Sequence, residues 1–179
     1  MTEPELIKGC IQKDQHCQRL LFEKHAGKMM SLCLRYANDE QEAQDILQDG
    51  FIKVFNYIYQ FKSEGSFEGW LRKIFVNTAL RHKSKQKLNF TDIDIIDNDR
   101  DFADDPFIAK ISENEIHQLI RQLPDGYRTI FNLNIIEGYS HEDIAKLLHI
   151  QSSTSRSQLL KARKMLQSLI LKHYKPIAQ

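Results

Sequence analysis

Apolar residues recur at intervals of three and four along two long stretches of this chain, residues 2–83 and 108–174. This spacing is typical of helices that bury one face, and the low content of Gly (7) and Pro (4) in 179 residues also favours helices. Between the two stretches the period lapses, and seven aspartates occur with little to bury. The sequence therefore predicts an all-α protein of two small helical domains, residues 1–86 and 111–179, joined by an acidic linker over residues 87–110.

Capping residues and short breaks indicate the helices of the N-terminal half. Thr2 with Glu5 has the spacing of a capping box, and a later helix is expected from about residue 40 to 59. A polar loop over residues 61–66 then precedes a helix from about residue 67 to 83, whose basic residues are expected to point outward. This half is therefore predicted to be a helical bundle.

The C-terminal half contains the pattern of a helix-turn-helix. Ser140 with Asp143 forms a variant of the capping box before a short helix, a tight turn follows at residues 149–151, and a long basic helix is expected from about Ser152 to His173. Five polar or cationic side chains of the last helix would then face a DNA major groove: Ser152, Ser153, Arg156, Ser157 and Lys161.

Opposite charges are sorted along the chain, although the formal net charge is only +1. Residues 1–68 carry a net charge of −3, residues 69–88 carry +6, residues 89–143 carry −9 and residues 144–179 carry +7. Two separated basic blocks indicate two contacts with a polyanion such as nucleic acid, which the acidic segment between them should avoid. Solvated helix faces are the alternative explanation for either block alone.

The composition argues against several functional classes. No stretch reaches the roughly 18 apolar residues of a membrane helix, and the N-terminus carries no targeting pattern, so we expect a cytoplasmic protein without membrane insertion. The three cysteines, at positions 10, 17 and 33, lack CxxC spacing and are expected to be reduced, buried thiols. Since there is no glycine-rich phosphate loop and no HExxH motif, and the seven histidines are scattered, we predict neither enzyme activity nor a metal or cofactor.

Several segments resemble, in the same order, conserved segments of the bacterial sigma-70 family, specifically its small extracytoplasmic-function (ECF) members, which keep only regions 2 and 4. The resemblance in the N-terminal half rests on residues 42–55 (EAQDILQDGFIKVF) and 65–77 (GSFEGWLRKIFVN). In the C-terminal half it rests on residues 123–131 (LPDGYRTIF), 137–145 (EGYSHEDIA) and 153–159 (STSRSQL). It covers nearly the whole chain and divides it into a region 2-like domain and a region 4-like domain.

This resemblance implies a promoter-specificity subunit, itself not an enzyme, that recruits core RNA polymerase, recognises minus-35 and minus-10 promoter elements and helps to melt the DNA. The implied partners are the beta-prime clamp helices and the beta flap of the polymerase, promoter DNA and, as in many relatives, an anti-sigma factor. The implied polymerase contacts share one helical face: Asp45, Gln48, Asp49 and Ile52. The implied minus-10 contacts lie in the loop and the helix after it: Phe61, Ser63, Ser66, Arg72, Lys73, Asn77, Arg81 and Lys83.

Three aromatic or polar positions carry further expectations. Trp70, next to the implied minus-10 contacts, is expected to pack inside the bundle. Ser155 stands where the family usually has an apolar core residue, which is expected to loosen the helix-turn-helix unless neighbours compensate. His149 stands where glycine often closes the turn, and it is expected to bear an unfavourable backbone conformation.

Two other interpretations of the protein's function are compatible with parts of the sequence. A helix-turn-helix regulator that binds duplex DNA alone, with the N-terminal bundle as a sensor or dimerisation domain, explains the basic last helix. It explains the basic block at residues 69–88 and the acidic linker less well. An adaptor built from helical hairpins explains neither basic block.

Overall fold

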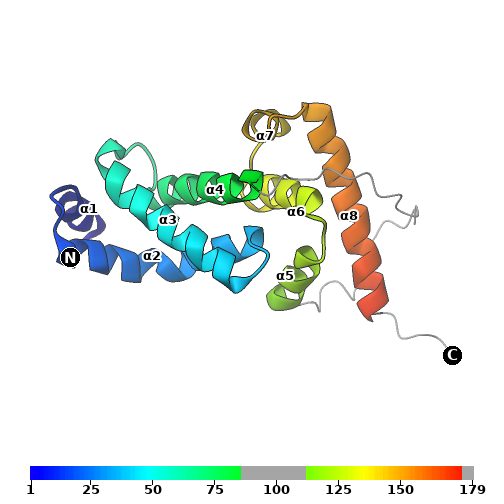
Figure 1. Ribbon diagram of the computed structural model, residues 1–179, viewed down its shortest axis with the longest axis horizontal. Helices are drawn as coiled ribbons and strands as arrows, with labels where there is room; N and C mark the ends of the chain where they lie inside the picture. Colours follow the sequence, from blue (N-terminus) through cyan, green and yellow to red (C-terminus); the bar gives the residue numbers. More distant parts are fainter. Residues whose placement is uncertain (86–111, 175–179) are drawn as a thin grey trace. The chain divides into compact units, whose positions relative to one another are not determined.

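The computed structural model describes residues 1–85 and 112–174, and every secondary-structure element in these two ranges is a helix (Figure 1). The all-α prediction is therefore confirmed. The chain divides between residues 87 and 88 into two compact units, called here the N-terminal and the C-terminal unit. The acidic linker predicted over residues 87–110 lies outside the described residues, and its boundaries stay a prediction.

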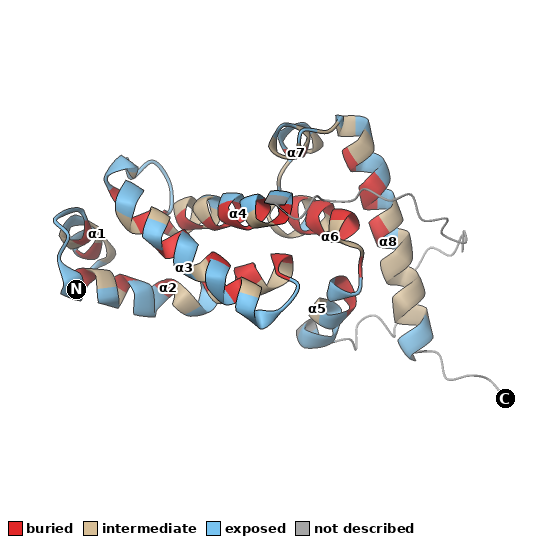
Figure 2. Ribbon diagram, in the orientation of Figure 1, coloured by how far each residue is buried: buried red, intermediate tan, exposed pale blue. Residues whose placement is uncertain are grey.

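Four α-helices and a 3₁₀ turn form the described part of the N-terminal unit: α1 (Glu3–Ile11), α2 (Gln15–Tyr36), α3 (Glu40–Tyr57), η1 (Ile58–Gln60) and α4 (Phe67–Lys85). Helix α2 packs against the other three α-helices, and α3 also packs against α4. Their inward faces form the core of the unit (Figure 2). Its largest apolar members are fully buried: Leu21, Met29, Leu32, Tyr36, Ile46, Ile58, Phe67, Leu71 and Phe75.

Side-chain caps fix where these helices begin. The backbone N–H of Thr2 donates to Oε2 of Glu5 at 2.7 Å, which confirms the predicted pairing at the start of α1. At the start of α3, the backbone N–H of Glu42 donates to Oδ1 of Asp39 at 2.8 Å. Each bond satisfies a backbone donor that the helix itself leaves without a partner.

Helix α3 is shaped by a turn at its end and a glycine in its middle. It ends at Tyr57, two residues before the predicted end, because the backbone tightens into η1. Gly50 is buried where α3 meets α4, and an added Cβ at this position would lie 2.3 Å from Cε1 of the buried Phe75 ring. Glycine at this position therefore permits the close approach of the two helices.

The C-terminal unit contains four α-helices and a π-helical segment among the described residues: α5 (Glu113–Arg121), α6 (Asp125–Phe131), η3 (Asn132–Ile136), α7 (His141–Leu148) and α8 (Ser152–Tyr174). The long helix α8 packs against α5, α6 and α7. The apolar residues that they bury are Leu119, Ile120, Leu123, Tyr127, Ile130, Leu133, Ile144, Leu159 and Ala162. Helices α7 and α8 form the predicted helix-turn-helix.

The turn between α7 and α8 uses a strained residue, as expected. His149 has φ 55° and ψ 44°, a left-handed conformation that glycine adopts most easily. The backbone N–H of Ile150 donates to the carbonyl oxygen of Ala145 at 3.1 Å and closes the turn. At the start of α7, Ser140 caps the helix by accepting a hydrogen bond from the backbone N–H of Asp143 at 3.1 Å.

Candidate functional site

The first candidate surface is one face of α3. Asp45, Gln48, Asp49 and Ile52 are all exposed there, in agreement with the spacing in the sequence, and Ile52 is 58% exposed. The opposite face of α3 is buried in the bundle and consists of Ala43, Ile46, Gly50, Phe51 and Val54. The fold thus presents two carboxylates, an amide and a large apolar side chain to the same side.

A histidine that the sequence did not point to lies beside this face. Nε2 of His82, on α4, is 2.9 Å from Oδ2 of Asp49. The two residues are 33 positions apart, so no local pattern could have joined them. Because the Asp49 side chain is 51% exposed, the contact contributes little to stability. Its effect is to orient the carboxylate on the surface of the unit.

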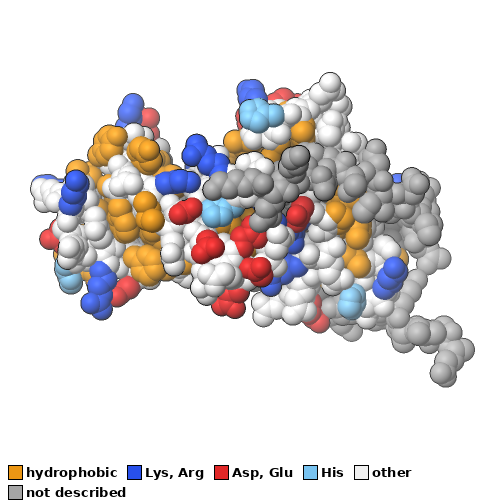
Figure 3. All heavy atoms as spheres, in the orientation of Figure 1, with side chains coloured by type: hydrophobic (Ala, Val, Ile, Leu, Met, Phe, Trp, Pro, Cys, Tyr) orange, Lys and Arg blue, Asp and Glu red, His pale blue; other side chains and the backbone are white. Residues whose placement is uncertain are grey.

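Exposed apolar side chains accompany these acids. Figure 3 shows hydrophobic side chains gathered over α2 and α3 of the N-terminal unit. Phe22 is 40% exposed and Tyr57 is 49% exposed, and the Phe22 ring lies 4.7 Å from that of Phe51. Large apolar groups that remain exposed on a folded domain are typical of a surface that binds another macromolecule.

The second candidate site is a pocket at the loop between η1 and α4. It has a volume of about 330 Å³ and nine lining residues: Gln60, Phe61, Lys62, Glu64, Gly65, Ser66, Gly69, Trp70 and Lys73. Three of the predicted minus-10 contacts, Phe61, Ser66 and Lys73, line this pocket. Ser63 lies instead in a neighbouring hollow of about 320 Å³, which α1 lines from the other side of the loop.

Aromatic rings form one wall of this pocket. Phe67 is buried, and the ring of Trp70 stacks on it with centroids 5.6 Å apart and planes inclined by 22°. Phe61 lies 5.8 Å from Trp70. The expectation that Trp70 packs inside is therefore met only in part, because Phe67 occupies the interior position and Trp70 covers it, half-buried, from the pocket side. Aromatic walls with polar groups at the rim suit an unstacked nucleobase.

The remaining predicted contacts of α4 separate into exposed and buried residues. Lys73, Asn77 and Arg81 are exposed and Arg72 is partly exposed, so these side chains can reach a ligand. Lys83 cannot, because it is only 1% exposed and its Nζ donates to Oδ1 of Asn38 at 2.7 Å. The structure therefore removes Lys83 from the candidate DNA contacts, since its charge is held inside the bundle.

The third candidate surface is the start of α8. Ser153, Arg156 and Ser157 are exposed, and Ser152 and Lys161 are partly exposed. The fold thus brings the five predicted side chains to the outside of the helix-turn-helix.

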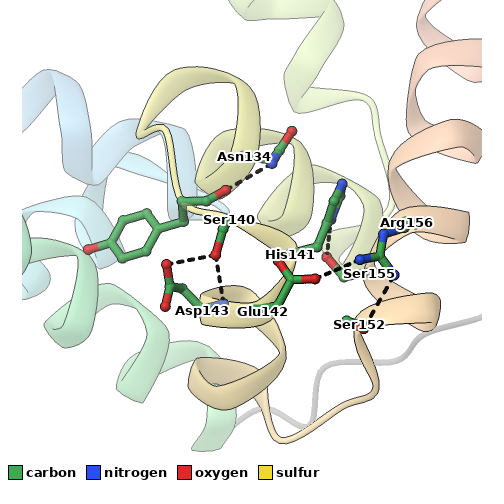
Figure 4. A network of polar contacts seen from close by, with 9 residues as sticks. Asn134, Ser140, His141, Glu142, Asp143, Ser152, Ser155 and Arg156 are labelled. Atoms are coloured by element: carbon green, nitrogen blue, oxygen red, sulfur yellow. Dashed lines mark hydrogen bonds and ion pairs between the residues drawn. The ribbon is translucent and has the colours of Figure 1, made fainter.

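Arg156 is already engaged in this surface. Its Nη2 donates to Oε1 of Glu142 at 2.6 Å and its Nη1 donates to Oγ of Ser152 at 3.3 Å (Figure 4). Glu142 lies in α7 and was not among the predicted contacts. Its proximity to Arg156 depends on how α7 and α8 pack.

Ser155 is joined to α7 by a partly buried hydrogen bond. Ser155 itself is fully buried, and its Oγ lies 2.8 Å from Nδ1 of His141 (Figure 4). The hydrogen bond satisfies a hydroxyl that would otherwise be unpaired in the core, so His141 compensates for the missing apolar side chain.

Three further properties of the described residues concern membranes, metals and thiols. In residues 1–85 and 112–174 no helix has the length and apolar character needed to cross a membrane. The same ranges contain no group of three or more His, Cys, Asp or Glu placed to hold a metal ion. The cysteines are buried as predicted, and burial raises the pKa of Cys10 to about 11 and that of Cys33 to about 12, which keeps both thiols protonated.

Comparison with models of protein families gives one match in each unit. Residues 21–88 match Sigma-70 region 2, and residues 113–166 match Sigma-70, region 4. Among curated proteins, the RNA polymerase sigma-H factor of Pseudomonas aeruginosa is 31% identical, with 90% of both chains covered. The ECF RNA polymerase sigma-E factor of Haemophilus influenzae is 28% identical, with 95% of this chain and 96% of the relative covered.

Two solved structures share the fold. CnrH, in complex with the cytosolic domain of CnrY, has a TM-score of 0.51 and 18% identity, and 95% of this chain and 97% of that chain are covered. The sigma factor RpoE of Bartonella quintana, in complex with the anti-sigma factor NepR, has a TM-score of 0.53 and 16% identity, with 88% and 98% covered. At these identities the likeness concerns the fold alone.

Proposed function

Because this chain belongs to the ECF subfamily of the sigma-70 family of RNA polymerase sigma factors, we propose that it is an alternative sigma factor. It binds core RNA polymerase, recognises minus-35 and minus-10 promoter elements and helps to melt the DNA where transcription starts. The observation that carries this proposal is the pair of family matches, region 2 and then region 4, each on its own helical unit. A promoter-specificity subunit of this kind carries out no reaction of its own, and we propose that it acts in the cytoplasm, where the polymerase is.

The α3 face is the proposed contact with the clamp helices of the beta-prime subunit. Asp45, Gln48, Asp49 and Ile52 are exposed together, and their mixture of acids and an apolar side chain fits a protein partner. His82 belongs to this surface through its contact with Asp49. The C-terminal unit would contact the beta flap, for which the resemblance is the support.

The pocket beside Trp70 is the proposed site for a base of the melted minus-10 strand. A base flipped out of the stack needs apolar walls, polar groups at its edge and cations for the backbone. Phe61 and Trp70 supply the walls and Ser66 a hydroxyl. On α4, the proposed backbone contacts are Arg72, Lys73 and Arg81. Asn77, like Ser63 in the loop, is a proposed polar contact to the base.

The start of α8 is the proposed reader of the minus-35 element, with Arg156 directed at a guanine and the serines at bases or phosphates. No acidic residue occurs between positions 144 and 179, which suits a surface that approaches phosphates. The proposed domains are residues 1–86 and 111–179 with a linker over 87–110. An anti-sigma factor is a further proposed partner, since CnrH and RpoE were each solved with a bound protein.

The test is to mix the purified chain with bacterial core RNA polymerase, isolate the complex by gel filtration and supply fragmented genomic DNA. We expect a stable complex that starts RNA chains at a defined set of sites, whose sequences reveal the promoter motif. Core polymerase alone is the control. If no complex forms and the chain alone binds duplex DNA, the protein is instead a helix-turn-helix regulator.

A further inference from the structure

The arginine proposed to read DNA is restrained by an acid from the neighbouring helix. Arg156 on α8 donates to Glu142 on α7 at 2.6 Å, and to Ser152 one turn earlier at 3.3 Å (Figure 4). The residues just before this pair, His141 and the buried Ser155, are joined by a hydrogen bond of 2.8 Å. Two consecutive residues of α7 therefore hold two consecutive residues of α8 in place.

The Glu142–Arg156 pair contributes little to stability. Both side chains remain more than half exposed, at 60% and 56%, and exposed ion pairs of this kind contribute about 0–1 kcal/mol. Its carboxylate and that of the adjacent Asp143 are the last two in the sequence, because residues 144–179 contain no acid. An acid on a surface that approaches DNA lowers affinity through repulsion from phosphates. The carboxylate also lies in the first turn of α7, where an acid favours the helix. Its ion pair with Arg156 adds little to that stability, so the pair calls for another explanation.

An arginine can contact DNA in two ways, of which only one depends on the base sequence. It can contact a phosphate, which is the same at every base pair, or it can donate two hydrogen bonds to O6 and N7 of guanine. A carboxylate beside the guanidinium opposes the first contact, because it repels a phosphate. It leaves the second available, since a guanidinium has five N–H donors and Glu142 and Ser152 each accept one bond.

We propose that Glu142 is a specificity-determining residue: it keeps the Arg156 guanidinium from phosphates and directs it to a base edge. This inference rests on the proposed function, in which α8 reads the minus-35 element. Discrimination between bases at one position then depends on the Glu142–Arg156 ion pair rather than on Arg156 alone. The carboxylate lowers the affinity for unrelated DNA and so increases specificity.

The test uses the full chain assembled with core RNA polymerase. The probes are one promoter fragment recovered in the transcription experiment and the same fragment with its minus-35 element scrambled. Glu142→Gln keeps the shape and a hydrogen-bond acceptor but removes the charge. We expect roughly 3- to 10-fold tighter binding of the scrambled fragment, a smaller change for the native one, and a slope of log K against log[salt] that is steeper by about one unit.

Two further variants isolate the cause. Glu137→Gln removes one negative charge elsewhere in the same unit and should leave the ratio of the two affinities unchanged. In an Arg156→Ala background, Glu142→Gln should have no effect, since the residue acts through the arginine.

Three results would overturn the inference. An unchanged affinity ratio for Glu142→Gln would make the pair an ordinary surface contact. If Glu142→Gln changes the affinity ratio equally in the Arg156→Ala background, its effect is one of overall charge and does not act through the arginine. If Arg156→Ala weakens both fragments equally and flattens the salt slope, Arg156 binds a phosphate and there is no base contact to direct. Failure of the proposed function is distinguishable from all three, because the wild-type chain would then form no transcribing complex.

Discussion

At the scale of single residues, the backbone at His149 leads to a stability prediction. Its left-handed conformation costs an L residue roughly 1 kcal/mol that glycine does not pay. We expect His149→Gly to stabilise the C-terminal unit by about 0.5–1 kcal/mol. Hydrogen exchange of the amides in α7 and α8 would measure this in the full chain. The matched control is Lys146→Gly, at an exposed helical position of α7, which should destabilise the unit by about 1 kcal/mol. Equal destabilisation by both variants would contradict the argument.

Single residues also mark where sequence reasoning succeeded and where it failed. The conformation of His149 was predictable, because the resemblance places it where the family often has a glycine to close the turn. The burial of Lys83 was not predicted, since the expectation placed every basic residue of the helix outside. Its position three and four residues after Leu80 and Ala79, both buried, in fact puts it on the inward face. Asn38, 45 residues earlier, supplies the acceptor that makes this burial tolerable.

At the scale of elements, the α3–α4 contact predicts the effect of a single methyl group. A Cβ at Gly50 would lie within 3 Å of three atoms of the Phe75 ring, which is fully buried. Because protein cores are close-packed, displacing this ring should be costly. We expect Gly50→Ala to destabilise the N-terminal unit by about 1–2 kcal/mol, although alanine is the better helix former. Gly27→Ala on α2 is the control, because a Cβ there meets nothing within 4 Å, and it should stabilise the unit.

Hydrogen exchange of α3 and α4 amides would separate the two glycine variants. Equal stabilisation by both would mean that α4 shifts at no cost to accept the methyl group.

Helix identity and helix contacts were predictable to different degrees. Caps and apolar spacing located the start of α1, and both ends of α3, α4, α7 and α8, to within about two residues, because these signals are local. The contacts between elements were not accessible in the same way. Asp49 on α3 contacts His82 on α4, and Glu142 on α7 contacts Arg156 on α8. Both contacts depend on how the helices pack, which no local pattern in the sequence specifies. The sequence therefore indicated the candidate surfaces, and the fold added the residues that orient their side chains.

At the scale of the whole molecule, the two units divide the work of a sigma factor, so a change in one function should leave the other intact. Asp49 is the most direct test, because its exposed carboxylate lies at the centre of the proposed polymerase surface and far in sequence from the helix-turn-helix. Reversing its charge would place a cation beside His82 and opposite the polymerase groups that bind the carboxylate. Loss of one partner of a charge pair that an interface buries costs roughly 2–5 kcal/mol or more.

We therefore expect Asp49→Lys to weaken binding to core RNA polymerase by about 100-fold or more, measured by titration of labelled chain. Binding of the free chain to duplex DNA should be unchanged. Glu23→Lys is the control, since it reverses the same charge on the exposed side of α2, away from the buried Leu21 and His25. Polymerase affinity that is unchanged in Asp49→Lys would remove α3 as the contact. A loss in both variants would show that overall charge, and not this face of α3, governs assembly.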